Sequence, residues 1–322
     1  MDSLHHAPKV TVLMTVFNGS KYIRDTIDSV LSQTFVDFEF MIIDDCSIDD
    51  SIEMIKSYND NRIQLIENKN NIGQSASLNL GLKLAKGEYI ARIDQDDICM
   101  ACRIEKQVKF LNSNLEVAVV GSYYTYIDSD GNLLGYKKLP VNSDSNLLYI
   151  ITGHNPLIHP GVLFRKKVIE EVGGYNEEYM PSEDIDLWLR LYQNGYNCDN
   201  IPEHLTCIRK HLDQSSVKQY NKQNNKHLLA FYNFYNELNK NPIFYDKIEQ
   251  YFNVLVWYTE KVNPNNIGNI VAILLNLFRK LKWSDRSNNN IFLNFRIFQL
   301  FGLVLLIMKS NIISVMRNNH NS

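Results

Sequence analysis

Two structural periods alternate along the first third of this chain, and this alternation restricts the fold more than any other feature. Apolar stretches typical of strands take turns with amphipathic stretches that have the period of a helix. The expected strands cover residues 10–17, 38–44, 62–67 and 88–93, and the expected helices cover 21–33, 49–58 and 74–86. Such alternation is typical of a parallel sheet with crossover helices. The sequence therefore predicts an α/β fold with a mostly parallel central sheet flanked by helices.

Polar side chains follow three of these expected strands. Asn18 comes after the first strand, Asp44 and Asp45 close the second, and the acidic stretch 94–97 closes the fourth. In open parallel sheets, ligands bind beyond the carboxyl ends of the strands. We therefore expect a ligand site at this edge of the sheet.

The acidic stretch reads "DQDD" and contains three carboxylates directly after a buried strand. In an extended chain Arg92, Asp94 and Asp96 point to one side. Two carboxylates on one face can bind one hard divalent cation, which prefers oxygen ligands. Asp97 stands before an amphipathic segment, and we expect it to cap that helix. The chain has neither of the glycine-rich phosphate motifs, so a diphosphate ligand would depend on a metal ion.

The second half of the chain has a mixed pattern. A strand is expected over residues 117–128, and a strand that runs into a helix is expected between His159 and Gly174. A further helix is expected over 182–195, capped by Ser182 and with acidic residues in its first turn, where they complement the helix dipole. The composition shifts near residue 216, so the sequence predicts one domain over 1–215 and a helical C-terminal region over 216–322.

Charge is distributed unevenly along the chain. The formal net charge is -3, yet residues 279–322 contain seven Lys or Arg and a single acidic residue. An acidic body with a basic tail argues against nucleic acid as the main partner. It allows an anionic membrane surface. The apolar run 297–308 is shorter than the ~20 residues that span a bilayer, which favours a buried or interfacial helix.

Cysteine usage and the first residues indicate the compartment. The five cysteines are scattered and odd in number, which does not suggest a disulfide framework. Cys99 and Cys102 form a C-x-x-C pair, but no further ligands stand at zinc-site spacing. The opening residues lack the pattern of a secretory signal. We expect a reducing, cytoplasmic location.

Four segments together resemble the family-two glycosyltransferases, which are inverting enzymes with the GT-A fold. These segments are the opening strand and helix with "DDCS", the run from "NKNNIG" to "DQDD", "SEDIDLWLRL" and "RKHLDQSS". The resemblance covers residues from about 9 to 216. Cys46 replaces the usual Gly, and Met100 and Ala101 stand where a proline usually begins the next helix.

The resemblance implies roles for residues near the nucleotide. Thr15 and Phe17 would line the base pocket, with the Phe17 ring against uracil. Asp45 would accept a hydrogen bond from the base. Asp94 would contact the ribose or a metal-bound water. These are expectations from the family pattern.

The resemblance also implies a metal site and a general base. Asp96 would ligate Mn²⁺ or Mg²⁺, and His211 would make a second contact with the metal or the diphosphate. Asp184 matches the family's general base. A carboxylate suits that role, because an acceptor hydroxyl is a poor nucleophile until its proton is removed.

The resemblance implies transfer of a sugar from a UDP-sugar to a hydroxyl of a glycan acceptor, lipid-linked, in polysaccharide biosynthesis on the inner face of the cytoplasmic membrane. Three alternatives stay open at this point. A nucleotidyltransferase would place a glycine-rich basic loop after the first strand, where "TVFNGSKY" has one Gly and one Lys. A glycoside hydrolase would use two carboxylates without a nucleotide. An inactive sugar-nucleotide-binding module would tend to lose the carboxylates that are present here.

Overall fold

The computed structural model describes residues 7–151, 154–212 and 214–238. The chain divides into two compact units, of which the first comprises residues up to 147 and 155–230, and the second comprises 148–154 and the residues from 231. All strands among the described residues and the whole candidate site belong to the first unit.

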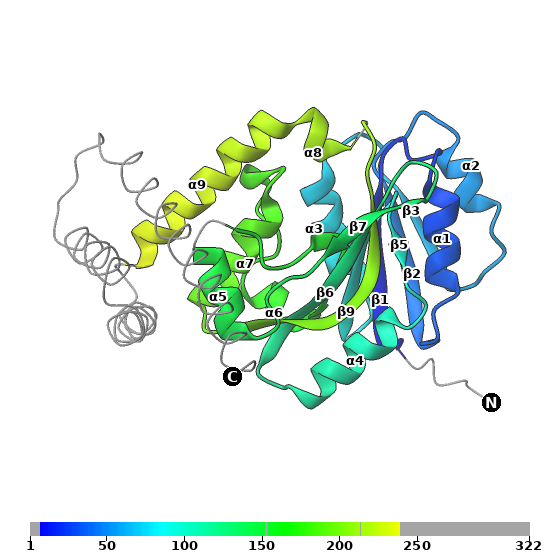
Figure 1. The fold of residues 1–322 in the computed structure, drawn as a ribbon. Coiled ribbons are helices and arrows are strands. Elements are labelled where there is room, and N and C mark those ends of the chain that lie inside the picture. Colours follow the sequence, from blue (N-terminus) through cyan, green and yellow to red (C-terminus); the bar gives the residue numbers. More distant parts are fainter. Residues whose placement is uncertain (1–6, 152–153, 213, 239–322) are drawn as a thin grey trace, which may run out of the picture. The chain divides into compact units, whose positions relative to one another are not determined.

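Four parallel strands form one half of the sheet, in the order β3-β2-β1-β4. Their bounds are β1 Val10–Val16, β2 Phe38–Asp44, β3 Ile63–Glu67 and β4 Tyr89–Asp94. The register pairs Thr15 of β1 with Ile43 of β2 and with Asp94 of β4, so these strands end together at one edge (Figure 1). The predicted α/β class is confirmed, and all four predicted strands are present.

The other half of the sheet is mixed. It continues from β4 in the order β8-β6-β9-β5, and β7 pairs with β6. These strands are β5 Ile98–Cys99, β6 Val117–Ile127, β7 Leu133–Lys137, β8 Leu163–Arg165 and β9 Asn197–Arg209. β6 and β9 are parallel, whereas β8 is antiparallel to both of its neighbours. The strands β5, β7 and β9 were not among the predicted ones.

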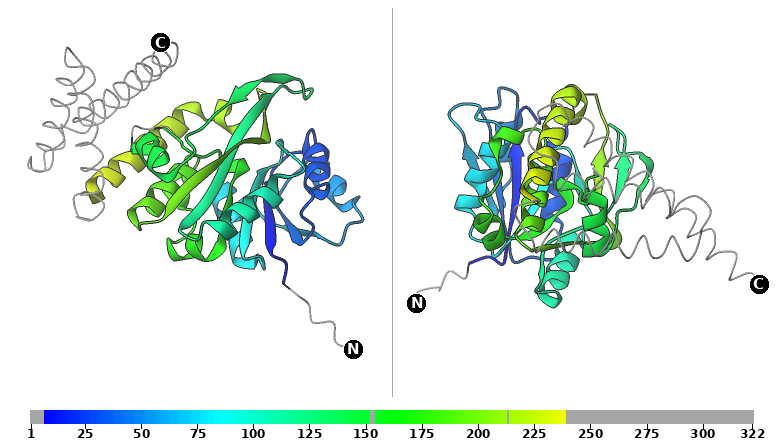
Figure 2. Two further views of the ribbon diagram at one scale, coloured as in Figure 1. Left: turned by 60° about the horizontal axis from the view of Figure 1, so that its bottom comes forward. Right: turned by 90° about the vertical axis from the view of Figure 1, so that its left-hand side faces the viewer.

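Helices of the first unit cover both faces of the sheet (Figure 2). The helices of the described residues are α1 Ile23–Leu31, α2 Ser51–Lys56, α3 Gln74–Leu84, α4 Arg103–Ser113, α5 Ser143–Ile151, α6 Lys166–Glu171, α7 Glu183–Gln193, α8 Ser215–Lys218 and α9 Tyr220–Leu238, of which α5 and α9 extend into the second unit. Successive side chains of β1 point to opposite faces of the sheet, so β1 contributes to the packing on both. Val12 and Met14 belong to the core that also contains the buried side chains of α1 and α4. Leu13 points the other way and lies against Gly81 of α3.

Two predicted helix caps differ from the structure. α4 begins at Arg103 with Cys102 at the N-cap position, so the prediction that Asp97 caps this helix was wrong. Asp97 instead accepts a hydrogen bond from the backbone N–H of Arg209 at 2.9 Å. Ser182 does precede α7, but its hydroxyl donates to the carbonyl of Gln223 at 2.9 Å and caps nothing. In both cases the polar side chain forms a hydrogen bond with a residue distant in sequence instead of with the first turn of the helix.

The C-terminal predictions fall mostly on residues that the structure does not describe. The apolar run 297–308 and its basic neighbours lie outside the described residues. None of the helices within 7–238 is both long and apolar enough to cross a membrane. All five cysteines are free, in agreement with the absence of a disulfide framework.

Candidate active site

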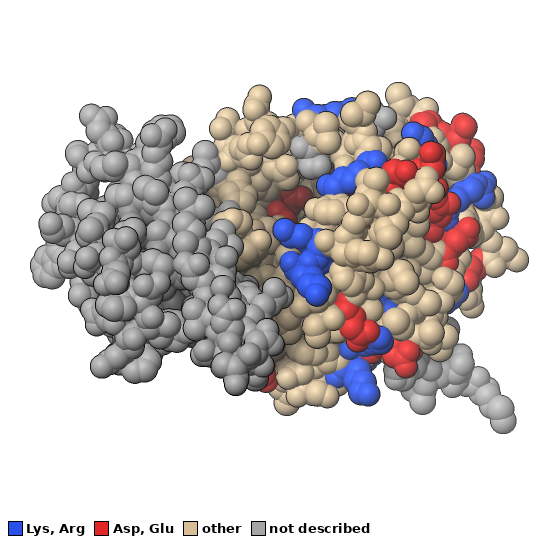
Figure 3. Space-filling model, viewed as in Figure 1, with Lys and Arg blue, Asp and Glu red and all other residues tan. Residues whose placement is uncertain are grey.

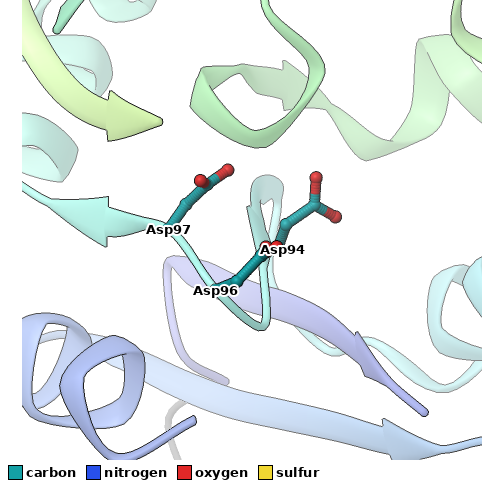
Figure 4. Close-up of side chains that lie close together, drawn as sticks. All are labelled: Asp94, Asp96 and Asp97. Carbon is teal, nitrogen blue, oxygen red and sulfur yellow. The ribbon is translucent and has the colours of Figure 1, made fainter. Parts of the chain in front are cut away.

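Three carboxylates gather where β4 ends. Asp94 is the last residue of β4, and Asp96 and Asp97 lie in the turn that leads into β5 (Figure 4). One oxygen from each can be chosen so that all three lie within 4.8 Å of one another. The turn brings them together because the chain reverses direction directly after the buried strand.

Two buried arginines offset part of this negative charge. The guanidinium of Arg92 is fully buried and pairs with the Asp94 carboxylate. Arg209, at the end of β9, donates from its Nε to the carbonyl of Asp96 at 3.0 Å and from its backbone to Asp97. Burial and the charge of neighbouring carboxylates raise the pKa of Asp96, and they raise the pKa of Asp97 well above its ordinary value. The cluster therefore favours binding of a further cation.

His211 joins this cluster from the segment after β9. Its Nε2 lies 2.8 Å from Oδ2 of Asp96, and its ring centroid lies 4.8 Å from that of Tyr22. The Nδ1 atom is buried and has no hydrogen-bond partner within the part of the chain that the structure describes. The carboxylate oxygens suit Mn²⁺ or Mg²⁺, which prefer oxygen ligands, and the imidazole nitrogen is an additional ligand of the kind that transition metals accept. The residues present fit the divalent cation that the sequence predicted.

The residues expected near a nucleotide base lie on the neighbouring strands. Thr15 is half-buried and pairs in register with Asp94. Phe17 is 46% exposed, which leaves its ring free to contact a ligand. Its backbone is held on both sides by the Gln95 side chain, with hydrogen bonds of 2.9 and 3.2 Å.

Asp45 is buried beside these residues at the end of β2. Its carboxylate accepts hydrogen bonds from the Asn68 amide at 2.9 Å and from the backbone N–H groups of Ile72 and Gly73 at 2.9 and 2.8 Å. A carboxylate offers about four lone-pair positions, so one position remains for a ligand donor. The three bonds fix the orientation of the carboxylate.

A second acidic pair opens helix α7. The Asp184 carboxylate accepts a hydrogen bond from the Asn155 amide at 2.7 Å, and burial raises the pKa of Asp184. Glu183 is only 4% exposed, and its Oε2 has no hydrogen-bond partner among the described residues. Burial, reinforced by the adjacent Asp184, raises the pKa of Glu183 to about 7. Asp186 is engaged elsewhere, in an ion pair with Arg190 at 2.7 Å.

The two acidic groups lie within electrostatic range of each other. The Asp94 carboxylate contributes to the raised pKa of Glu183, and the buried Arg92 opposes it. Figure 3 shows acidic side chains at the bottom of a hollow whose rim carries Lys and Arg side chains. A cation site with a nearby buried carboxylate can hold an anionic ligand next to a proton acceptor.

Six of the seven candidate residues lie at or next to the ends of strands or of a helix that the sequence predicted, whereas His211 follows β9, which was not predicted. The structure brings Asp96 and His211 into direct contact and sets Thr15 beside Asp94. Sequence reasoning missed the burial of Glu183 and the contact of Asn155 with Asp184. The position of Glu183 in the "SEDID" segment was visible in the sequence, whereas nothing there identified Asn155.

The chain is similar in sequence to known glycosyltransferases. A family model described as Glycosyl transferase family 2 matches residues 11–173. The "Uncharacterized glycosyltransferase MJ1057" of Methanocaldococcus jannaschii is 34% identical over 206 residues, which cover 63% of this chain and 71% of the relative. The O-antigen biosynthesis glycosyltransferase WbnJ of Escherichia coli is 34% identical over 238 residues, covering 71% of this chain and 87% of the relative.

A solved structure shares the fold. It is TarS of S. aureus, residues 1–349, in complex with UDP-GlcNAc, with a TM-score of 0.57 and 17% identity over 90% of both chains. A longer TarS chain is matched over 39% of its length. At this level of identity the likeness concerns the fold alone, and it agrees with the predicted GT-A architecture.

Proposed function

This chain belongs to glycosyl transferase family 2, and from that premise we propose that it is an inverting glycosyltransferase that moves a sugar from a UDP-sugar to a hydroxyl of a glycan acceptor. The observation that carries the proposal is the cluster of Asp94, Asp96 and Asp97 with His211, close to the buried acids of α7. The relative WbnJ, which is described as an O-antigen biosynthesis enzyme, supports a role in polysaccharide biosynthesis.

The donor nucleotide would bind at the ends of β1, β2 and β4. The exposed Phe17 ring offers a flat apolar surface for uracil, and the oriented Asp45 carboxylate offers an acceptor for a base N–H. Thr15 would line the same pocket, and Asp94 would contact the ribose or a metal-bound water. The TarS complex with UDP-GlcNAc supports the choice of a UDP-sugar.

Asp96 and His211 would hold Mn²⁺ or Mg²⁺, with Asp94 beside them. A bound divalent cation neutralises charge on the diphosphate as it departs. The structure motivates a direct test, since the described chain shows no glycine-rich phosphate loop. UDP should raise the melting temperature only when the metal is present. Equal stabilisation by UDP in a chelator would contradict the metal role, and so would an Asp96→Asn variant that keeps the metal requirement.

Asp184 would accept the proton of the acceptor hydroxyl. The Asn155 amide orients its carboxylate, and burial with a raised pKa makes it a stronger base than an ordinary aspartate. Asp184→Asn should lower turnover by a factor of about 10² to 10⁴, the usual contribution of a general base, while UDP affinity persists. A variant that loses UDP affinity as well would show that Asp184 supports the structure of the site instead.

Stereochemistry tests the inverting character independently of these residues. An α-linked UDP-sugar should give a β-linked product, which the anomeric NMR signals report. An α-linked product would contradict direct displacement by the acceptor hydroxyl. An inactive sugar-nucleotide-binding module would bind UDP with metal but give no product with any of a panel of UDP-sugars.

The location proposed for the protein is the inner face of the cytoplasmic membrane, next to a lipid-linked acceptor. The motivation is the apolar run 297–308 and the seven basic residues of 279–322, in the C-terminal region proposed for residues 216–322. Each basic residue near an anionic surface contributes about 1 kcal/mol. The full-length protein should sediment with anionic vesicles at low salt and much less with neutral ones. Equal recovery in the supernatant with both would contradict the proposal.

A further inference from the structure

The loop after β1 is held by side chains from two other loops. The backbone N–H groups of residues 17–20 all donate to side-chain oxygens. The N–H of Phe17 donates to Oε1 of Gln95, in the turn after β4, at 2.9 Å. The other bonds, of 2.8 to 3.0 Å, go to side chains of the segment after β2, namely Ser47, Asp49 and Ser51. The loop that carries the exposed Phe17 ring is therefore joined to the turn after β4 through Gln95.

Gln95 makes two hydrogen bonds with the backbone of Phe17. Its Oε1 accepts from the Phe17 N–H at 2.9 Å, and its Nε2 donates to the Phe17 carbonyl at 3.2 Å. Only one orientation of the carboxamide satisfies both bonds, so the pair fixes the side chain and the loop together. Gly19 leaves room for this group, because a Cβ there would stand 2.5 Å from Oε1 of Gln95. The carboxamide and the loop are thus closely packed as well as hydrogen-bonded.

Gln95 also stands between two residues of the proposed metal site. Asp94 precedes it and Asp96 follows it in the turn after β4 (Figure 4). The Gln95 carbonyl accepts a hydrogen bond from the hydroxyl of Thr26, a fully buried residue of α1, at 2.9 Å. The backbone of Gln95 is thus anchored to a helix while its side chain holds the loop. A cation bound by Asp94 and Asp96 would fix the turn, and this turn carries Gln95.

The two expected ligands would act at opposite ends of this connection. The nucleotide base is expected against Phe17, and the cation is expected at Asp96. Each ligand would reduce the freedom of the segment that it contacts. When hydrogen bonds join two segments, ordering of one lowers the entropy cost of ordering the other. The two sites are then coupled, and each ligand raises the affinity for the other by the same factor.

We propose that Gln95 is a positioning residue that couples cation binding at Asp94 and Asp96 to base binding at Phe17. This inference rests on the proposed glycosyltransferase function, since it takes the nucleotide base to lie against Phe17. It adds that the cation prepares the base pocket in addition to its role at the diphosphate. The consequence is that a nucleoside without any phosphate binds more tightly when the cation is present.

The test uses 5-fluorouridine, because this probe has the base and the ribose but no phosphate to contact the cation. Fluorine NMR titration of the full-length protein gives its affinity in a chelator and in saturating Mg²⁺. Mg²⁺ should raise this affinity about five- to tenfold, at the lower end of the usual coupling between two sites. The affinity for Mg²⁺, measured by calorimetry with and without 5-fluorouridine, should rise by the same factor.

Two substitutions interrupt the connection in different ways. Gln95→Met keeps the length of the side chain and removes both hydrogen bonds, whereas Gly19→Ala keeps Gln95 and places a Cβ in the space of its carboxamide. In both variants the effect of Mg²⁺ on 5-fluorouridine affinity should fall to within about twofold. The affinity for Mg²⁺ without nucleoside should persist. The matched control is Gln64→Met, at an exposed position of β3, which should keep the full effect.

Hydrogen exchange of the Phe17 amide, followed by NMR, gives a readout that needs no nucleotide. Mg²⁺ alone should slow this exchange in the unmodified protein and in Gln64→Met, because the acceptor of the amide lies in the turn that the cation fixes. In Gln95→Met the amide loses this acceptor, so its exchange should be faster and insensitive to Mg²⁺. The amides of residues 18–20, which donate to the segment after β2, should change little in Gln95→Met.

Four results would overturn the inference. The first is an affinity of the unmodified protein for 5-fluorouridine that Mg²⁺ leaves unchanged. The second is a full Mg²⁺ effect in Gln95→Met, which would assign the coupling to the ribose and a metal-bound water. The third is loss of Mg²⁺ binding in that variant, which would show that Gln95 only supports the turn. The fourth is exchange of the Phe17 amide that does not respond to Mg²⁺ in the unmodified protein.

Failure of the proposed function is distinguishable from failure of this inference. If the function is wrong, the unmodified protein should bind neither 5-fluorouridine nor UDP, with or without Mg²⁺. If the coupling alone is wrong, both ligands should still bind.

Discussion

Replacement of Glu183 by Gln should stabilise the protein at alkaline pH and have no effect at acidic pH. Glu183 is 4% exposed, and its Oε2 has no hydrogen-bond partner among the described residues. Burial therefore penalises the ionised form, and the adjacent Asp184 adds repulsion. Glutamine keeps the shape of the side chain and removes the charge. The substitution isolates the cost of one buried carboxylate.

The magnitude follows from the pKa. Folding raises the pKa of Glu183 from 4.5 to about 7, so the folded state binds the proton more tightly than the unfolded state does. Stability must then fall as the pH rises from about 4.5 to about 7. Each pKa unit corresponds to 1.36 kcal/mol, which gives a loss of about 3 kcal/mol above pH 7. Glu183→Gln should recover this amount at pH 8 and nothing below pH 4.5.

The assay is urea unfolding in the presence of a chelator, at several pH values between 4.5 and 8. It gives the difference in free energy of unfolding between the variant and the unmodified protein. The buried aspartates titrate in both proteins, so most of their contribution cancels. Glu177→Gln, an exposed glutamate just before α7, serves as the control and should give a difference near zero throughout. If Glu183→Gln changes the free energy of unfolding by the same amount at pH 4.5 and pH 8, the reasoning is refuted. Only a Glu183 carboxyl whose pKa is raised by folding makes this change depend on pH.

Two further predictions concern the backbone. Cys46 has a left-handed φ of 65°, so Cys46→Gly should remove a strain of about 1–2 kcal/mol, partly offset by the greater freedom of Gly in the unfolded chain, for a net gain of about 0.5–1 kcal/mol in urea unfolding. Ile48→Gly, at an exposed position without a positive φ, should instead destabilise; a loss at both positions would contradict the strain. A Cβ on Gly87 would stand 2.3 Å from the backbone nitrogen of Thr11, so Gly87→Ala should cost about 1–3 kcal/mol, whereas Gly135→Ala, with nothing within 4 Å, should stay within about 0.5 kcal/mol. Equal unfolding midpoints for these two alanine variants would show that the Thr11 backbone yields freely.

The parallel half of the sheet was predictable because its pattern is local. Each strand there is a short apolar run, and β2 is buried at every residue. The helices between the strands have a clear amphipathic period. The mixed half was harder to predict. β9 has polar residues on both of its faces and takes its conformation from pairing with β6, which lies about 80 residues away in sequence.

The candidate site was also predictable only in part. The sequence alone determined which residue types follow which strand, and in a parallel sheet this suffices to gather Thr15, Asp45 and Asp94 at one edge. It could not assign Asp97, because the hydrogen-bond partner of its carboxylate is the backbone N–H of Arg209, 112 positions away in sequence.

Tertiary structure decided the electrostatics. His211 meets Asp96 across 115 positions of sequence, and Asn155 meets Asp184 only because the segment before β8 passes the first turn of α7. The raised pKa of Glu183 depends on burial by residues from other elements, and an identical glutamate on an exposed first turn would complement the helix dipole instead. Periodicity records which side of its own element a residue occupies. The pKa of a buried acid depends on which dipoles and charges the rest of the chain places around it, and local sequence does not record those.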